Sequence, residues 1–530
     1  MTKPVHPHPQ KQVTDERCAQ IIDLATSVDT SLAEQASTIA SQADTIEEQA
    51  ETIAAQAAEI ERLQAIIDAM PQPPEIRKPD LWVLPSATGD GSGSSPENCA
   101  AYSTLATLAK NCGPDKVIGL LGDRADWPNV STIKFTNTSG QEGAPILIRG
   151  TDEAGQPYRT ELRSSRPAPL LFEEPGSYPG GSGDTLTIPR DEWAQGARDG
   201  GTTVFQFDAN ANWLSFSHLN ALNIKAMGYY ASDCIGHCWS DIDLYNVQHA
   251  WWMSDDPVSG SPTEKCIQQM LWERFKVEYF EEDVFRWFGT SHHLIARDFE
   301  MHSKRCMGNI TFGFAIGYGG DPRNDVVTDW EIARGKISSC HDTAYEKPWC
   351  SDPPTYTSEG ANGRCYYPKP GLVRDPKVWS GDVPGKKYWN GDGISVERNC
   401  DRGLIEDVEI YGCTDGGIDC KASDIIMRRV VSRDNKRNYR LWGQRMRMEE
   451  CTSDAGRKRG GSSGVAHVWL DGADGTGKVG CELALDRCTF KGTPTYAFSI
   501  DSAQSYGIKV TGAETCTFEG VTSNVPAYKP

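Results

Sequence analysis

The feature that most constrains the fold is a repeat of short paired strands, which starts near residue 202 and continues toward the C-terminus. In residues 416–431, two short stretches of alternating apolar residues flank a polar corner. Similar units recur roughly every 22–30 residues, a spacing typical of solenoids. They centre on Phe216, Ile242, Phe285, Phe314, Ile394, Leu441, Leu470 and Ile500. Since the turns are too short for crossover helices, the repeat predicts a coil of stacked parallel strands.

Cysteine-threonine pairs support this interpretation. Each of the pairs follows the second strand of a unit, which predicts stacked, equivalent positions; their cysteines are Cys413, Cys451, Cys488 and Cys516. The competing fold is a β-sandwich, which would require hairpins with Asn-Gly or Asp-Gly turns, and few are present.

A second repeat, of seven residues, covers residues 22–67. Apolar residues share one heptad position, d, at Leu32, Ile39, Ile46, Ile53, Ile60 and Ile67. Alanines share position a at Ala36, Ala43, Ala50 and Ala57, and glutamines precede them at Gln35, Gln42, Gln49 and Gln56. This pattern predicts a coiled coil, and β-branched Ile at d favours a parallel trimer. The alternative is one amphipathic helix packed on its own domain.

These patterns divide the chain into five parts. We expect a short N-terminal leader at 1–21, a coiled-coil stalk at 22–70 and a Pro-rich linker at 71–84. A cap with the first coils follows at 85–200, and the parallel β-helix itself at 201–525. Its long irregular insertion, residues 341–389, is expected to protrude and to wall a site.

Composition narrows the possible partners. The net charge of -20 opposes binding to phosphate backbones, so we expect no nucleic-acid partner. The sequence contains no run of about 18 apolar residues, so we expect no insertion into a membrane.

The first residues lack the apolar core of a signal peptide, so export is expected through another route, such as cell lysis. The 17 Cys are scattered, so most are expected to be buried and reduced, with Cys340, Cys350 and Cys365 as candidates for pairing.

Several segments resemble right-handed parallel β-helix proteins, the group that includes pectate-lyase-like enzymes and phage tailspikes. Residues 85–93 and 143–150 look like the cap and first coils of that group, and residues 390–394, 415–421 and 435–442 look like its central coils. The resemblance covers roughly residues 80–520. It implies a mainly β fold, a right-handed parallel β-helix. The heptad repeat predicts that an α-helical coiled coil precedes it in a homotrimer.

Strand alternation predicts which residues of these coils face outward. With Ile394, Ile418, Leu441 and Leu470 inside, one outer strip carries Glu397, Asp419, Lys421, Arg440, Trp442, Trp469, Asp471 and Asp501. Exposed tryptophans beside charged groups suit a polysaccharide, because sugar rings stack on aromatic faces. Residues 428–459 hold eleven Lys or Arg and four Asp or Glu, which favours an anionic ligand, and Arg437 is a candidate contact. The alternative is a solvated ladder of alternating charges, with the tryptophans in a trimer interface and the basic residues paired with acidic neighbours across it.

Two mechanisms remain open. In a lyase, Lys421 is the candidate base, with its pKa lowered by Arg440, and Asp392, Asp415 and Asp419 are candidates for holding Ca²⁺. A carboxylate beside Lys421 would instead raise that pKa. In a hydrolase, Asp419 would work with Glu397 or Asp471 as a pair of carboxylates. The basic residues favour the lyase. The acidic cluster at residues 281–283 and the histidines His237, His292 and His293 are expected to have ordinary structural roles.

The stalk and the β-helix together look most like a phage tailspike or tail fibre. We therefore expect a virion tail protein, assembled in the host cytoplasm, which attaches to other tail or capsid proteins through its N-terminus. It would bind, and cleave, a bacterial surface polysaccharide. The rival hypotheses are a non-enzymatic receptor-binding or structural fibre and a free-standing pectate-lyase-like enzyme.

Overall fold

The computed structural model describes the chain in two units, residues 1–69 and 70–530. In the first unit it describes scattered helical positions between residues 20 and 57. In the second it describes residues 77–166, 201–253, 266–280, 283–302, 311–317, 326–338, 391–413, 415–456, 464–472, 480–500 and 506–529. The insertion expected at 341–389 and the three cysteines within or beside it lie outside these residues.

Every described position of the first unit is helical, as the heptad repeat predicts. The heptad d residues Leu32, Ile39, Ile46 and Ile53 are between 57% and 66% exposed in the single chain. A row of exposed aliphatic side chains on one helix is what a coiled-coil partner would cover. The helix is therefore confirmed at these positions, and its association with other chains stays a prediction.

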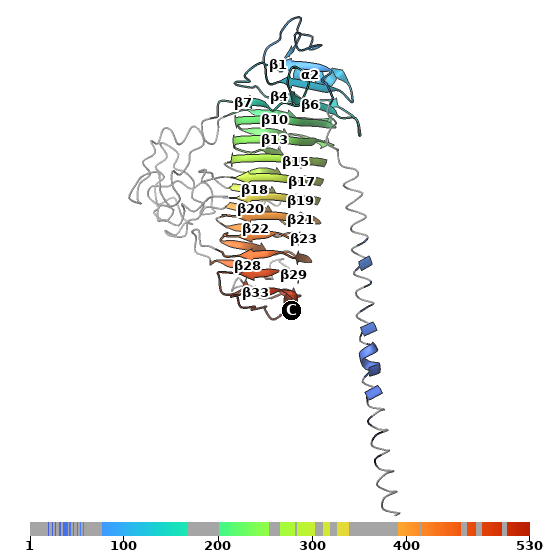
Figure 1. Ribbon diagram of the computed structural model, residues 1–530, viewed down its shortest axis with the longest axis vertical. Helices are drawn as coiled ribbons and strands as arrows, with labels where there is room; N and C mark the ends of the chain where they lie inside the picture. The colour runs from blue at the N-terminus through green and yellow to red at the C-terminus, as the bar shows by residue number, and fades with distance from the viewer. Residues whose placement is uncertain are drawn as a thin grey trace, which may run out of the picture. The chain divides into compact units, whose positions relative to one another are not determined.

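The second unit begins with a small cap. Helix α2 (Leu105–Cys112) buries Leu105 and Ala109, which join the same hydrophobic core as the coils below. In Figure 1, α2 lies at the blue end of the stack of strands. A solenoid exposes apolar residues at its first coil unless something covers them, and α2 does this here.

The rest of the unit is built from two long sheets. An eleven-stranded sheet contains β4 (Ile133–Phe135), β8 (Thr203–Phe207), β11 (Ala226–Tyr230), β14 (Trp251–Met253), β16 (Asp283–Trp287), β18 (Thr311–Ile316), β20 (Gly391–Val396), β22 (Gly416–Cys420), β25 (Arg437–Leu441), β28 (Ala466–Leu470) and β31 (Phe498–Ile500). These strands follow one another in chain order. Each therefore belongs to the coil after its predecessor.

A twenty-stranded sheet forms the other walls. It contains β1 (Leu81–Leu84), β2 (Ala100–Ala101), β3 (Val117–Leu121), β6 (Ile146–Thr151), β7 (Thr160–Arg163), β10 (Leu214–Ile224), β12 (Cys234–Ile235), β13 (Cys238–Val247), β15 (Cys266–Phe280), β17 (Thr290–His302), β19 (Val326–Ser338), β21 (Gly403–Tyr411), β23 (Ile425–Arg428), β24 (Val431–Arg433), β26 (Met446–Glu449), β27 (Thr452–Asp454), β29 (Glu482–Asp486), β30 (Thr489–Lys491), β32 (Lys509–Thr511) and β33 (Thr517–Glu519). A short pair, β5 (Thr138–Ser139) and β9 (Ala211–Asn212), lies apart.

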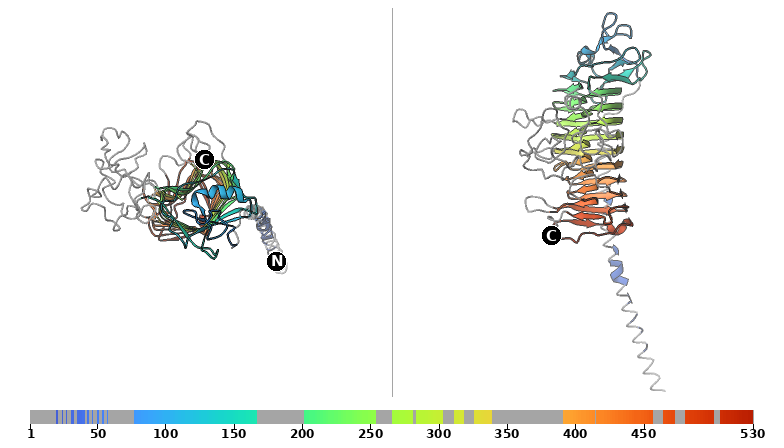
Figure 2. Two further views of the ribbon diagram at one scale, coloured as in Figure 1. Left: turned by 90° about the horizontal axis from the view of Figure 1, so that it is seen from above. Right: turned by 90° about the vertical axis from the view of Figure 1, so that its left-hand side faces the viewer.

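All pairings between these strands are parallel, from β1 with β2 to β30 with β33. The stacked rungs are visible in Figure 1, and the end-on view in Figure 2 shows the strands enclosing a central core. The prediction of a parallel β-helix is confirmed, and the β-sandwich is wrong for the described residues. The long strands of the twenty-stranded sheet, such as β15 and β17, supply two of the walls of each coil.

The interior is packed by aromatic rows. Phe285 stacks on Phe314 in the next coil with ring centroids 4.7 Å apart, and Trp251 stacks on Phe285 at 4.8 Å. All three side chains are fully buried. Burial of rings of this size, in offset stacks, is the main source of stability in such a core.

The long strands bend at residues that adopt a left-handed backbone conformation; β15 contains three of them and β17 two. One row of these corner residues alternates in charge along the coils: Asp241, Arg274, Asp298, Arg334, Asp407, Arg429, Glu450 and Arg487. Arginine at a φ near +50° is strained, because a left-handed conformation brings its Cβ close to the backbone. Here each arginine donates to an acid of the preceding coil; Arg429 binds Asp407 through two hydrogen bonds, of 2.7 and 2.8 Å. We call this set the corner ladder.

The cysteine-threonine prediction is right for three pairs and wrong for one. Thr452, Thr489 and Thr517 are in register, so Cys451, Cys488 and Cys516 occupy equivalent positions in successive coils. Cys413 does not, because Val431 pairs with Glu409 and the chain has already turned where Cys413 stands. Every cysteine among the described residues is a free thiol. None of the helices that the structure describes is long and apolar enough to cross a membrane.

Candidate active site

The outward-facing residues of the eleven-stranded sheet form one row. Ser395 pairs with Asp419, Asp419 with Arg440, Arg440 with Trp469, and Trp469 with Ser499. The residues on either side of them, such as Ile418 and Cys420, are fully buried in the core. The alternation predicted for these coils is therefore confirmed, and the outer strip exists.

A cluster of acids and arginines occupies the middle of this strip. Arg440 Nη1 lies 2.8 Å from Asp419 Oδ2 and 3.4 Å from Asp415 Oδ2. Arg437 Nη1 contacts the other oxygen of Asp415. The Asp392 carboxylate accepts a hydrogen bond from the Gly416 backbone N–H, at 2.5 Å. All three aspartates are at most 3% exposed, so two buried carboxylates share two arginines, and the third accepts a backbone hydrogen bond.

Lys421 joins the cluster from the end of β22. Its Nζ contacts Glu397 Oε1 and lies 3.6 Å from Asp419 Oδ2. The ammonium also lies 5.7 Å from the ring centre of Trp442, and the Arg440 guanidinium lies 4.3 Å from it. Trp442 therefore makes cation–π contacts with both Lys421 and Arg440.

The cluster drives the pKa values of two of its carboxyl groups apart. Burial raises the pKa of Asp392 well above its usual range, and the nearby charges of Asp415 and Asp419 raise it further. Burial acts on Asp419 in the same direction, but Arg440, Lys421 and Arg437 outweigh it and lower the pKa of Asp419. The pKa values of Asp392 and Asp419 are thus shifted in opposite directions, which is the pattern that acid–base catalysis uses.

The prediction that Lys421 is a base with a lowered pKa is wrong. Burial alone would lower the pKa of Lys421, but Asp419 and Glu397 hold the positive charge in place, and the pKa is raised. Lys421 is therefore an ammonium group that can bind an anion or stabilise negative charge, and it cannot accept a proton at neutral pH.

The predicted calcium site does not fit the residues present. Within the described ranges, no group of three or more His, Cys, Asp or Glu side chains is placed to hold a metal ion. Both oxygens of Asp415 already contact arginines, and Asp392 faces a backbone N–H. A divalent cation would have to compete with Arg437 and Arg440 for the same oxygens.

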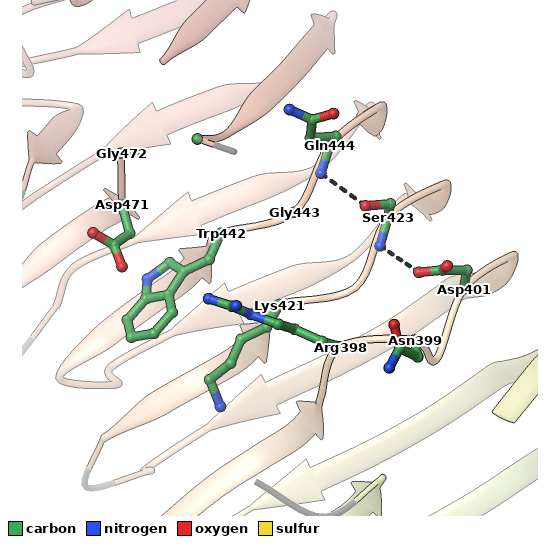
Figure 3. A pocket seen from close by; sticks show the side chains of 11 residues that line it. Arg398, Asn399, Asp401, Lys421, Ser423, Trp442, Gly443, Gln444, Asp471 and Gly472 are labelled. Carbon is green, nitrogen blue, oxygen red and sulfur yellow. Dashed lines mark hydrogen bonds between the residues drawn. The ribbon is translucent and has the colours of Figure 1, made fainter. Parts of the chain in front are cut away.

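A pocket of about 160 Å³ opens beside the cluster, where the strands of four coils turn away from the eleven-stranded sheet. Figure 3 shows Trp442 and Asp471 on one side of it and Lys421 and Arg398 on the other. Its far wall is a hydrogen-bonded row, in which the Ser423 N–H donates to Asp401 Oδ1 at 2.8 Å and the Gln444 N–H donates to Ser423 Oγ at 3.2 Å.

Of the other predicted residues, some lie beside the cluster, one lies outside the described residues and one belongs to the core. Trp469 and Arg437 are together, with the guanidinium 4.7 Å from the ring centre, and Asp471 lines the pocket. Asp501 lies outside the described residues, although the strand before it reaches Ser499 in the same row. His237 is a core residue as expected, since it is fully buried and its Nε2 lies 2.7 Å from the Ala211 carbonyl oxygen.

Sequence reasoning missed two sets of residues. Arg398, Asp401, Ser423 and Gln444 stand at turns, where alternation gives no direction. Tyr229, Trp252 and Arg286 lie on the same outward row in earlier coils. Alternation would have found these three, because Trp251 is buried and Trp252 is its neighbour.

Comparisons with known proteins give a limited result. No protein-family model matches the chain, and no curated protein does either. Among solved structures, pectate lyase Pel9A is similar over 72% of this chain and 78% of its own, with 11% identity and a TM-score of 0.33. An alginate lyase from Paenibacillus covers 79% and 98% of the two chains, at 11% identity and a TM-score of 0.31. XylC in complex with xylose covers 84% and 86%, at 7% identity and a TM-score of 0.41.

These likenesses carry no argument about what the chain does. The class of protein is defined by the strand pairing and the cluster: a parallel β-helix with buried carboxylates and arginines on one outer face.

Proposed function

We propose that the protein is a glycan-cleaving enzyme that acts on a polysaccharide at the outer face of the eleven-stranded sheet. The observation that carries this proposal is the placement of Asp392, Asp415 and Asp419 with Arg437 and Arg440 between two partly exposed tryptophans. A carboxylate–arginine cluster of this kind is costly to bury, and a β-helix coil does not need one to fold. Aromatic rings on both sides suit sugar units on both sides of a scissile bond.

Hydrolysis is the reaction that the cluster supports best. Asp392, whose pKa is raised by burial, donates a proton to the glycosidic oxygen. Asp419, held ionised by Arg440 and Lys421, activates water or attacks the sugar directly. Lys421 and Arg440 bind the charged or polar substituents of the sugar beside it. Lyase chemistry is less favoured, because Asp419 and Glu397 raise the pKa of Lys421, the predicted base, and so keep it protonated.

The test is incubation of the purified protein with a panel of bacterial capsular and O-chain polysaccharides. New reducing ends without the ultraviolet absorbance of an unsaturated uronate are expected. Both signals together would indicate elimination instead of hydrolysis. Asp419→Asn and Asp392→Asn are each expected to lower the rate about 10²- to 10⁴-fold. Asp126→Asn, at an exposed position away from the cluster, is the matched control.

A non-enzymatic fibre is the second candidate, and the burial of the cluster favours it. Asp392 and Asp415 are 1% exposed, so substrate must displace covering groups to reach them. Binding of a polysaccharide without new reducing ends, unchanged in Asp419→Asn, would establish this adhesin function.

We also propose that the protein is a trimeric tailspike or tail fibre of a phage virion. The heptad repeat and its exposed row of isoleucines support the trimer. In this proposal the N-terminus attaches to other tail or capsid proteins, and the chains are assembled in the host cytoplasm. The β-helix then meets the polysaccharide of the host surface. Immunogold labelling of purified virions with antibodies against the β-helix tests the location, and virions that carry no label would contradict it.

A further inference from the structure

The outward row that contains Asp419 extends well beyond the cluster. Counting from the cap, its members are Lys134, Gln206, Tyr229, Trp252, Arg286, Ala315, Ser395, Asp419, Arg440, Trp469 and Ser499. One residue comes from each coil, and coils are about 4.8 Å apart. The row is therefore a straight line along the axis of the β-helix.

A second group of aromatic and basic side chains lies on this line. Tyr229 and Trp252 are partly exposed, with ring centroids 5.0 Å apart. The Arg286 guanidinium lies 5.6 Å from the centre of the Trp252 ring, and Lys225 Nζ lies 5.7 Å from it. Tyr229, Trp252 and Arg286 are here called the upper aromatic group.

The upper aromatic group repeats the chemistry of the site below it. Arg286 is held by the buried Asp283 at 2.6 Å, as Arg437 is held by the buried Asp415. Asp283 is also in register with Asp392, through Phe312 of the intervening coil. In both places a guanidinium that is fixed by a buried acid lies over a tryptophan ring.

Small residues separate the two groups. Ala315 and Ser395 occupy the row between Arg286 and Asp419, and both are less than 9% exposed. The row therefore carries only small side chains over these two coils, and large rings at Trp252 and Trp469. Trp252 lies four coils from Asp419, about 19 Å, and six coils from Trp469, about 29 Å. One pyranose unit advances about 5 Å, which is close to the step between coils.

We propose that the upper aromatic group is a second sugar-binding subsite, about four sugar units from Asp419, for a polysaccharide that lies along the axis of the β-helix. The inference rests on the proposed function and adds the direction of the chain, the length of its binding site and a set of residues. A polymer spans both tryptophans across Ala315 and Ser395. A fragment of about three units that is bound at Asp419 does not reach Trp252.

Binding measurements with an inactive background test the proposal. The background is Asp419→Asn, and the probes are the polysaccharide that the wild-type protein cleaves and the shortest fragments of its digest. The ratio of polymer affinity to fragment affinity is measured by calorimetry. Trp252→Ala is expected to lower this ratio about tenfold, because a stacked ring and a cation–π contact are lost. Trp252→Phe should restore most of it.

A matched control and a blocking variant accompany this measurement. Tyr245→Ala removes an exposed aromatic residue of the twenty-stranded sheet, away from the row, and should leave the ratio unchanged. Ala315→Trp places a large ring between the two groups and should lower the ratio at least as much as Trp252→Ala. This variant adds a side chain to the row, so its effect does not depend on the removal of a native contact.

The outcomes separate the two proposals. A polysaccharide that is cleaved, with an equal ratio in the parent and in both Trp252→Ala and Ala315→Trp, would overturn the subsite and leave the proposed function intact. If the wild-type protein neither cleaves nor binds any polysaccharide of the panel, both proposals fall. A reduced ratio in both variants, with Tyr245→Ala unchanged, supports the subsite.

Discussion

At the scale of single residues, Asp392 and Asp419 are the same side chain in opposite electrostatic surroundings. Both are buried on neighbouring coils, and they differ in their nearest charges. Asp419 has Arg440 at 2.8 Å, whereas Asp392 has a backbone N–H and two other aspartates. Removing the charge should therefore have opposite effects on stability at the two positions.

Asp392→Asn is expected to stabilise the folded protein near neutral pH while it lowers the rate of cleavage. Since burial raises the folded-state pKa of Asp392, the stability supplied by its protonated form is present below the ordinary pKa of 3.8 and is lost as the pH rises toward the folded-state value. A neutral amide avoids this loss. The melting temperature at pH 7 should rise by about 2 °C, and the difference should vanish near pH 3. An equal gain at both pH values would contradict the explanation.

Asp419→Asn should destabilise the protein under the same conditions. Arg440, Lys421 and Arg437 overcome the effect of burial and lower the pKa of Asp419, so its stabilising charge is present above 3.8 and is lost as the pH falls through the folded-state pKa. Breaking a buried pair of this kind costs about 3 kcal/mol. Denaturant unfolding at pH 7 and at pH 3 measures the change, which should be smaller at the lower pH.

Prediction from sequence succeeded at Asp419, Arg440 and Trp469, because strict alternation within a strand is a local property. It grouped Asp392 with Asp419 only as a candidate calcium ligand and did not place it on the outer strip. The chain departs from alternation just after this residue: a Cβ on Gly393 would meet Ile410 in the core, and Ile394 also faces inward. Asp392 therefore faces the same side as Ser395, which no period of two predicts. Turn residues such as Arg398 could not be predicted either, because alternation gives no side-chain direction outside a strand.

At the scale of elements, the coils were predictable from their spacing and the bends in the long strands were not. A residue with a left-handed backbone conformation is usually Gly or Asn, so such a corner can often be recognised in a sequence. The corner ladder instead uses charged residues, and Arg429 has a φ of 50°. Its strain is offset by ion pairing with a residue one coil away, which the sequence alone does not bring into view.

Arg429→Ala is expected to destabilise the β-helix by about 1–2 kcal/mol, because the strain remains while the pair with Asp407 is lost. Arg429→Gly also loses the pair but relaxes the backbone, so it should cost about 1 kcal/mol less. Arg447→Ala is the control, since Arg447 pairs with Glu449 from an ordinary strand position. Chemical denaturation compares the variants; equal losses in Arg429→Ala and Arg429→Gly would show that the corner is not strained.

At the scale of the whole molecule, the exposed isoleucine row makes association of the chains a prediction with a clear measurement. The single chain has a mass of 58.2 kDa, and light scattering of the full-length protein should give three times this value. Removal of residues 1–76 should yield a monomer, because the heptad repeat is lost. Replacement of Ile39, Ile46 and Ile53 by Asn should have the same effect without shortening the chain. A full-length monomer would refute the trimer.

The corner ladder has a consequence for how such a molecule can change its length. Its hydrogen-bonded pairs join coils two by two: Asp241 with Arg274, Asp298 with Arg334, Asp407 with Arg429, and Glu450 with Arg487. Loss or duplication of one coil would bring two like charges together at a strained corner, whereas loss or duplication of two coils would keep the order of signs. We therefore expect that insertions or deletions which preserve the fold add or remove an even number of coils.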